Sequence, residues 1–202
     1  KTEIAYRSGG HYDLADVVGG GDGLGSGKSG AGIDPLTGNV QVAPRGLLEK
    51  VEPNLPLRSQ VRFVDTVVVP TASSEGTPIS STGLRARGVE KTSGQAWDAI
   101  RNGPVNSQFS TKLGDADYAA GHSLLSLHAN AAITFDLAEL RKAGAPTEMV
   151  FTAIVGYFGQ TPKDGATCRV FVDGEPAFVR ERIGRDDGAI TVKVPLPKRA
   201  RF

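Results

Sequence analysis

The sequence is poor in the residues that build disulfides and metal centres: its 202 residues include one cysteine, three histidines and one tryptophan. A single thiol, Cys168, excludes a disulfide within the chain, although this absence does not distinguish the cytoplasm from an extracytoplasmic space. Cys168 alternates with Val170 and Val172, which favours a buried structural thiol. Zinc is disfavoured, because His122 and His128 have no third ligand nearby in the sequence.

Long apolar runs and an excess of one charge are also absent. No apolar run approaches the roughly 20 residues that a membrane-spanning helix requires, so no membrane span is expected. The 23 basic and 22 acidic residues are scattered and leave a net charge of +1, which argues against nucleic acid as a partner. The chain has no signal peptide and begins with Lys1, and we interpret it as a piece of a longer protein.

The most informative stretch, residues 117–137, reads DYAAGHSLLSLHANAAITFDL. Apolar side chains recur at every second residue from Ala131 to Leu137, which predicts a half-buried strand. Ser123–Leu127 is a second short strand that leads into His128 and Asn130. An imidazole and an amide at a loop between two strands indicate a recognition corner rather than a reaction centre.

Short strands and turn signals dominate the rest of the chain. Val150–Phe158 is almost wholly apolar, which predicts a strand covered on both faces. Cys168–Val172 and a strand ending at Val179 form a hairpin around a favoured Asp-Gly turn. Other strands are expected at residues 13–18, 40–42, 61–70, 79–87, 108–113 and 190–194.

Two short helices are expected. One begins at Ser93 and ends at Ile100, with Trp97 on the same side as Ile100 and in the core. The other begins after Asp136 and is closed by Gly144. Since a parallel α/β sheet needs long amphipathic helices, the fold class that the sequence predicts is all-β, a β-sandwich with one or two short helices.

The first 57 residues differ from the rest in composition. Ten glycines fall between Gly9 and Gly32, and four prolines follow. We expect residues 1–57 to form a segment that packs on a sandwich made by residues 58–202.

The glycine-rich stretch DGLGSGKS, residues 22–29, approaches two ligand-binding patterns. A phosphate-binding loop requires glycine where Asp22 stands and a helix after it, whereas Gly30, Gly32 and Pro35 follow. A calcium loop of the EF-hand kind fails as well, because Leu24 occupies a ligand position. Calcium held by distant loops remains as an alternative to ordinary turn aspartates, with these candidates: Asp22, Asp34, Asp115 and Asp117.

Catalytic constellations are not expected. Residues 121–125 resemble a nucleophile elbow except that Leu125 replaces the final glycine. Ser123 could meet His122 or His128, yet no set of acid, base and nucleophile emerges. The chain is therefore not predicted to be an enzyme.

Sugar recognition needs flat aromatic surfaces and planar polar groups. For Trp97 core packing is the competing interpretation, and for His128 it is a structural role. Side chains of the required types lie mostly in expected loops: Trp97, Arg101, Asn102, Asn106, Gln108, His128, Asn130, Tyr157 and Gln160.

Three stretches together resemble the NPCBM family of carbohydrate-binding modules, which are attached to bacterial glycoside hydrolases and other surface proteins. They are residues 117–137, then VFTAIVGYFGQTPKDGATCRVFVDGEP (residues 150–176) and ITVKVPLPKRARF (residues 190–202). The matching positions, in order, are Gly121, His128-Ala129, Asp136-Leu137, Phe151, Ala153, Val155-Gly156 and Asp173-Gly174. The upstream half, with IDPLTG and AWDAIRNGPVNSQFSTKLG, resembles a variant found in bacterial envelope proteins.

The resemblance implies a galactose-binding-like jelly roll, a structural Ca²⁺ and galactose-type glycans as ligands. From the motif, His128, Asn130 and Tyr157 are carried over as ligand contacts, although Tyr157 stands where the family commonly has an aspartate. Trp97 and Arg101 complete the expected ligand site, and Asp115 and Asp117 are the expected metal ligands. The family continues past the position of Phe202 into a further strand, so the sandwich is expected to be truncated at its C-terminus.

These inferences predict a non-catalytic carbohydrate-binding module of a larger bacterial envelope or secreted protein, in an extracytoplasmic location. The alternative is a structural or protein-interaction domain without sugar binding. In that case another part of the parent protein, or a protein partner, would complete the sheet.

Overall fold

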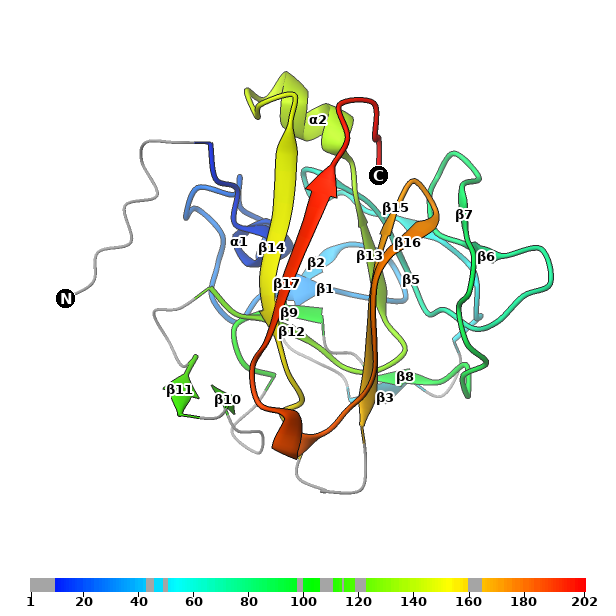
Figure 1. The fold of residues 1–202 in the computed structure, drawn as a ribbon. Coiled ribbons are helices and arrows are strands. Elements are labelled where there is room, and N and C mark those ends of the chain that lie inside the picture. Colours follow the sequence, from blue (N-terminus) through cyan, green and yellow to red (C-terminus); the bar gives the residue numbers. More distant parts are fainter. Residues whose placement is uncertain are drawn as a thin grey trace.

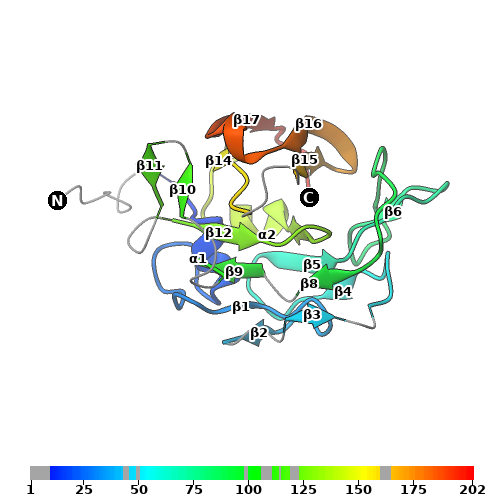
Figure 2. The ribbon, with the colours of Figure 1, turned by 90° about the horizontal axis from the view of Figure 1, so that it is seen from below.

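The computed structural model describes residues 10–42, 46–48, 51–97, 100–105, 111–113, 115–118, 123–159 and 165–202. They form antiparallel strands in several small sheets, with two short α-helices and one 3-10 turn at Arg185–Asp187. The all-β prediction is thereby confirmed. The arrangement is sandwich-like, because strands β14 to β17 lie along one side and strands β1, β2, β4, β5 and β9 along the other (Figure 2).

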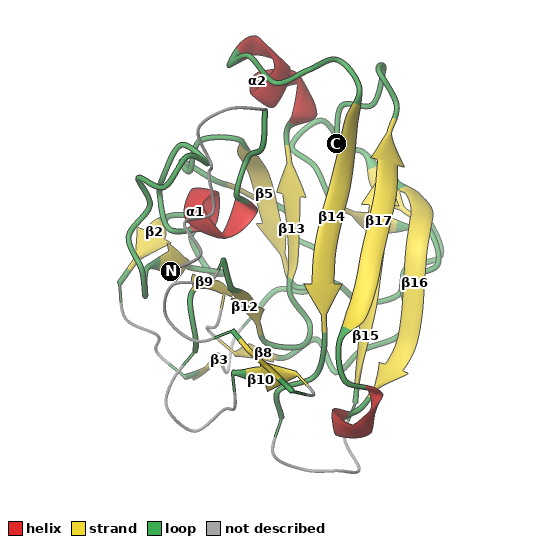
Figure 3. Cartoon of the chain, turned by 60° about the vertical axis from the view of Figure 1, so that its left-hand side comes forward, coloured by secondary structure: helices red, strands yellow, loops and turns green. Residues whose placement is uncertain are grey.

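The first side contains the longest strands, in two antiparallel pairs. The pairing of β14 with β17 runs without a shift over seven residues, and Figure 3 shows the two strands side by side. The pairing of β15 with β16 contains two register shifts. The bounds are β14 (Met149–Val155), β15 (Ala166–Val172), β16 (Glu175–Ile183) and β17 (Ile190–Leu196).

The opposite side is built from shorter strands in two sheets, in the orders β13-β5-β4 and β12-β9-β1-β2. Because β1 pairs with β9, the glycine-rich N-terminal segment is joined to the rest by backbone hydrogen bonds. The bounds are β1 (Gly32–Ile33), β2 (Val40–Gln41), β4 (Leu57–Arg58), β5 (Val64–Val68), β9 (Ile100–Asn102), β12 (Leu125–Leu127) and β13 (Ala132–Phe135).

Three two-stranded hairpins or pairs complete the described strands. They are β3 (Leu47–Leu48) with β8 (Ala96–Trp97), β6 (Thr77–Pro78) with β7 (Arg85–Ala86), and β10 (Lys112–Leu113) with β11 (Ala116–Asp117). None of the helices that the structure describes is long and apolar enough to cross a membrane.

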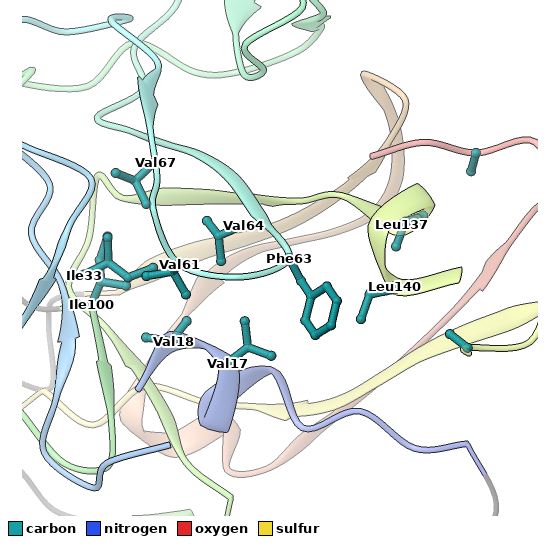
Figure 4. Close-up of a cluster of buried hydrophobic side chains, with 12 residues drawn as sticks. Val17, Val18, Ile33, Val61, Phe63, Val64, Val67, Ile100, Leu137 and Leu140 are labelled. Atoms are coloured by element: carbon teal, nitrogen blue, oxygen red, sulfur yellow. The ribbon is translucent and has the colours of Figure 1, made fainter. Parts of the chain in front are cut away.

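The hydrophobic core draws on both the N-terminal segment and the sandwich strands (Figure 4). Val17 and Ile33 are fully buried in the same cluster as Val67 and Ile100. The rings of Tyr12 and Phe63 meet in an edge-to-face arrangement, with centroids 5.8 Å apart and planes inclined by 82°. The described part of the N-terminal segment is therefore part of the core.

Helix α2 (Leu137–Lys142) confirms the expected helix after Asp136. The Asp136 carboxylate accepts hydrogen bonds from the amides of Ala138 and Glu139, and so caps the first turn. Gly144 follows with a φ of 106°, a conformation that glycine adopts at low cost. Both signals are local, which is why the sequence pattern is sufficient for this helix.

Helix α1 (Leu14–Val18) corrects the prediction of a strand at residues 13–18. The Asp13 carboxylate accepts hydrogen bonds from the amides of Ala15 and Asp16, which makes Asp13 an N-cap. A five-residue segment with one charged residue, such as Leu14–Val18, is too short for its periodicity to distinguish a helix from a strand. The N-cap at Asp13 favours the helix over the strand, because it satisfies amides of the first helical turn.

The predicted helix at Ser93–Ile100 was wrong, because the described residues there form β8 and the start of β9. The Ser93 hydroxyl accepts a hydrogen bond from the Gln95 amide, which forms a turn. After this turn the chain pairs with other strands: Trp97 lies opposite Leu47, and Ile100 lies opposite Leu127. Tertiary pairing thus outweighed a weak helical preference.

Two strand predictions were right only in part. Of residues 79–87 only Arg85 and Ala86 are strand, in β7, and residues 79–84 form the connection from β6 to β7. Strand β14 exists, but Val150 and Ile154 are each 50% exposed, so only one of its faces is covered. An unbroken apolar run therefore does not show that both faces are buried.

Candidate functional site

The loop after β12 lies beside the end of β8, so the recognition corner expected at His128 and Asn130 has an aromatic neighbour. Pairing of β12 with β9 places Leu127 opposite Ile100 and so positions the loop. The aromatic neighbour is Trp97, which lies 31 residues earlier in the chain.

Asn130 fastens this loop to the segment before β8. Its side-chain nitrogen donates one hydrogen bond to the Gln95 carbonyl oxygen at 2.8 Å and one to the Ser93 hydroxyl at 3.2 Å. Its φ is 65°, in the left-handed region that asparagine tolerates better than most residues. Because the amide nitrogen has two protons, a ligand contact from Asn130 would use the amide oxygen.

The rings of Trp97 and His128 lie against each other, with centroids 5.4 Å apart and planes inclined by 32°. Trp97 is 45% exposed, which corrects the interpretation that it belongs to the core. His128 is half buried, and its Nδ1 atom lies 3.4 Å from the Ala129 carbonyl oxygen. The pair presents an accessible aromatic face whose orientation is held by the loop.

Burial lowers the pKa of the His128 imidazole below its ordinary value of about 6.5, and the nearby Ala129 carbonyl opposes this effect. Burial disfavours the charged form, so the neutral ring is the form suited to this position. A neutral imidazole can both donate and accept one hydrogen bond, which suits contact with a hydroxyl group.

Stability is therefore expected to fall when His128 becomes protonated. The folded-state pKa is lower than the unfolded one, so this contribution is fully present above about pH 6.5 and is lost as the pH falls below it. Urea-unfolding midpoints at about pH 7.5 and about pH 5.5 test this. The fall in midpoint should be smaller in His128→Gln than in the wild type, and equal falls would contradict the role given to His128.

Two other predicted ligand residues lie elsewhere. Arg101, in β9, is 3% exposed, and its Nη1 atom donates a hydrogen bond to the Gly30 carbonyl oxygen. Tyr157 follows β14, and its hydroxyl lies 2.0 Å from the place that a Cβ on Gly159 would occupy. The structure thus brings Trp97, His128 and Asn130 together, buries Arg101 under the glycine-rich segment, and places Tyr157 after a strand of a different sheet.

The expected metal ligands, Asp115 and Asp117, lie at the β10–β11 hairpin and are exposed. Asp117 accepts a hydrogen bond from the Thr111 hydroxyl at 2.6 Å. Asp34 accepts hydrogen bonds from the Leu36 amide and the Thr37 hydroxyl, as a turn aspartate does. In the described ranges no three His, Cys, Asp or Glu side chains gather where they could hold a metal ion. Calcium binding stays a prediction.

Asp22 also has a local role. The Ser26 hydroxyl and the Leu24 amide donate hydrogen bonds to its carboxylate. Both bonds lower the pKa of Asp22, and the bond from Ser26 has the larger effect.

The free thiol of Cys168 is partly buried, and burial raises its pKa. A thiol with a raised pKa is a poor nucleophile at neutral pH, which fits the structural role expected for it.

Ser123 contacts Asp13 rather than a described histidine. Its hydroxyl donates a hydrogen bond to Asp13 Oδ1 at 2.6 Å, the same oxygen that caps α1. The contact joins the start of the segment before β12 to the first helix. Other candidates lie outside the described residues: Asn106, Gln108, His122 and Gln160.

Sequence reasoning missed Ser93 and Gln95, which fix the geometry of the corner. Ser93 was interpreted as a helix cap. A serine hydroxyl can equally accept a hydrogen bond from the amide two residues later, here that of Gln95, and so form a turn. The link from Asn130 to this turn spans 35 to 37 residues, and no local pattern reveals such a contact.

Two shallow hollows lie away from Trp97 and His128. One, of about 260 Å³, lies at the Arg58, Asp136 and Arg201 side chains, and the other, of about 190 Å³, is lined mainly by apolar residues that include Leu36 and Leu57. Both are smaller than the roughly 300 Å³ at which sites for small molecules begin.

Comparison of the chain with protein-family models, curated proteins and solved structures gives no match.

Proposed function

We propose that this protein is a non-catalytic recognition module that binds a glycan on the exposed surface formed by Trp97 and His128. The observation that supports the proposal is the exposed ring pair, held beside a loop that Asn130 anchors. Sugars present flat C–H faces that pack on aromatic rings, and an open platform needs no deep cavity. The imidazole beside the indole supplies hydrogen bonds to hydroxyl groups.

The resemblance to the NPCBM family supplies the finer part of the proposal. It names galactose-type glycans as the ligand class, a jelly roll as the topology and a structural Ca²⁺ as the ion. It also places the module in a larger bacterial envelope or secreted protein, outside the cytoplasm.

Titration calorimetry with galactose, N-acetylgalactosamine and a panel of oligosaccharides, with and without calcium, tests this function. Trp97→Ala is expected to weaken binding at least about tenfold, because the variant loses the ring that carries the sugar face. His128→Ala is expected to act in the same direction.

Val179→Ala serves as the matched control, because Val179 is also 45% exposed but lies on β16. Its affinity should equal that of the wild type, and circular dichroism should show that all variants are folded. If folded wild-type protein binds nothing in the panel, or if Trp97→Ala binds as well as the wild type, the glycan proposal is wrong.

The second candidate is that the same sandwich serves as an assembly element without sugar binding. The observation that favours it is the presence of unpaired strand edges in the described structure, at β13 and β15. Strand edges with free backbone groups are sites where further polypeptide can pair.

A further inference from the structure

The larger of the two hollows, about 260 Å³, lies far from the Trp97 and His128 rings. Asp136, which caps α2, lines it, and Figure 1 shows α2 at the top of the molecule and β8, which ends at Trp97, in the lower half. A drug-sized ligand needs more space than this, whereas one residue of a longer chain needs less. The hollow is therefore a second candidate site, separate from the ring pair.

The charged lining of this hollow comes from two parts of the chain, and each part supplies one guanidinium group. Strands β4 and β5 supply Arg58 and Asp65, while the start of α2 and the C-terminal residues supply Asp136, Glu139 and Arg201. Charged groups lose hydration when a ligand covers them unless the ligand replaces their hydrogen bonds. The lining therefore suits a ligand with charged and hydroxyl groups rather than an apolar one.

The carboxylates of the hollow already have donors within the protein. Asp65 accepts hydrogen bonds from the Ser81 amide at 2.7 Å and from the Ser81 hydroxyl at 2.5 Å. Asp136 Oδ1 accepts from two amides of α2, and Glu139 accepts from Lys142 Nζ at 2.6 Å. Their negative charges are therefore partly compensated before any ligand binds.

The two guanidinium groups have fewer partners. Arg58 is exposed, and in the part of the chain that the structure describes its side chain makes no hydrogen bond or ion pair. Arg201 Nη2 lies 3.6 Å from Asp136 Oδ2, which is too long for a hydrogen bond, and its guanidinium lies 4.8 Å from the centroid of the Phe202 ring. A guanidinium has several N–H donors and pairs best with a carboxylate. The unused capacity of the hollow is thus that of donors, which favours an anionic ligand.

The backbone beside the hollow is strained. Phe63, which also lines it, has a φ of 67°, a conformation that bulky side chains rarely adopt. The Phe63 carbonyl oxygen accepts from the Asp136 amide at 2.8 Å, and the Val64 amide donates to the Val61 carbonyl oxygen at 3.1 Å. These bonds hold the turn before β5 against the start of α2. Strain that the surrounding structure maintains in this way is concentrated at binding sites.

The mixture of charges narrows the class of anion. A single carboxylate can receive hydrogen bonds from Arg58 and Arg201, whereas a phosphate dianion brings a higher charge close to three carboxylates. An acidic side chain of a protein has no hydrogen-bond donor to offer those carboxylates. A uronic acid residue does, because hydroxyl groups surround its carboxylate, and a carboxylate oxygen that already accepts one bond can accept another.

We propose that this hollow binds one uronic acid residue of an acidic glycan. Arg58 and Arg201 bind the carboxylate of the sugar, and Asp136 and Glu139 accept hydrogen bonds from its hydroxyl groups. The site is additional to the surface at Trp97 and His128 and assigns an anionic class of sugar to the protein. Only the choice of a glycan rests in part on the proposed function.

Titration calorimetry with a trisaccharide of galacturonic acid and with its methyl ester, at a salt concentration of about 0.15 M, tests the site. The ester keeps the sugar rings and loses the charge, so we expect it to bind at least about tenfold more weakly. Arg58→Gln and Arg201→Gln should each weaken binding of the acid by at least about tenfold. Arg199→Gln is the matched control, because Arg199 is exposed on the same segment but does not line the hollow. It should change the affinity by less than about twofold.

Neutral oligosaccharides are titrated into Arg58→Gln as well. Their binding should equal that of the wild type, because Arg58 lies away from Trp97, so this site and the proposed function can fail independently. The proposal is overturned if the acid does not bind, if acid and ester bind equally, or if Arg58→Gln and Arg199→Gln cause equal losses. It is also overturned if a glutamate-rich peptide binds as tightly as the acid and depends on Arg58, since the ligand would then be a protein.

Discussion

Replacing Asp16 with alanine is expected to lower the free energy of unfolding by about 4 kcal/mol, because a buried amide and a partly buried amide lose their charged acceptor. Asp16 lies in α1 and is 4% exposed. Its Oδ2 accepts from the Gly23 amide at 2.7 Å, and its Oδ1 accepts from the Gly27 amide at 2.5 Å. An unsatisfied buried amide costs about 1–3 kcal/mol, and hydrogen bonds to a charged group are at the strong end of the range.

The glycine-rich segment explains why this carboxylate matters. Residues 19–28 wrap around Asp16, and a Cβ on Gly27 would lie 2.1 Å from the Asp16 carbonyl oxygen. Only glycine lets the chain approach so closely. The segment that looks like a phosphate-binding loop in sequence is therefore ordered by a carboxylate of the chain itself.

Urea unfolding followed by circular dichroism measures the effect of Asp16→Ala. Asp22→Ala is the matched control, because Asp22 also has two hydrogen-bond donors but is much less buried than Asp16. We expect its cost to stay below about 1 kcal/mol. Equal losses in the two variants would show that Asp16 does not organise the segment.

Gly32→Ala is expected to lower the free energy of unfolding by about 3 kcal/mol, because the new methyl group meets backbone on a neighbouring strand. Gly32 lies in β1, opposite Gln41 on one side and Arg101 on the other. A Cβ at this position would be 1.9 Å from the Ile100 carbonyl oxygen and 3.1 Å from the Arg101 Cα atom. The backbone of β9 must move away from β1 to relieve the clash.

The comparison for this variant is Gly184→Ala, which adds the same methyl group in open space. Gly184 has a φ of −102°, and the nearest atom to its Cβ would be Asp187 Oδ2 at 3.6 Å. Its stability should change by no more than about 0.5 kcal/mol. If the urea midpoints of the two variants coincide, β1 does not pack against β9 as described.

Elements with local signals could be predicted from the sequence. The turn between β15 and β16 consists of Asp173 and Gly174, with φ values of 49° and 85°, as the Asp-Gly dipeptide favours. The alternating pattern located β13 and β17, and the all-β class followed from such strands. The jelly-roll topology stays a prediction, because the described strands form several separate small sheets.

The candidate site could be predicted only as a set of residue types. His128 and Asn130 were located by the strands around them, but Trp97 was assigned to the core and to a helix. Its exposure and its contact with His128 depend on the pairing of β8 with β3 and of β12 with β9. Arg101, which has the right chemistry for sugar hydroxyls, is buried beneath Gly30 instead.

The sequence by itself determined the features that nearest neighbours control: the cap of α2 at Asp136, the Asp-Gly turn and the period of the longer strands. Tertiary structure decided which residues meet beyond the range of a single turn, such as Trp97 with His128 and Asp16 with the amides of Gly23 and Gly27. The physical reason is that local preferences amount to less than about 1 kcal/mol per residue. Burial and pairing of a whole strand exceed that, so they override the local pattern wherever the two disagree.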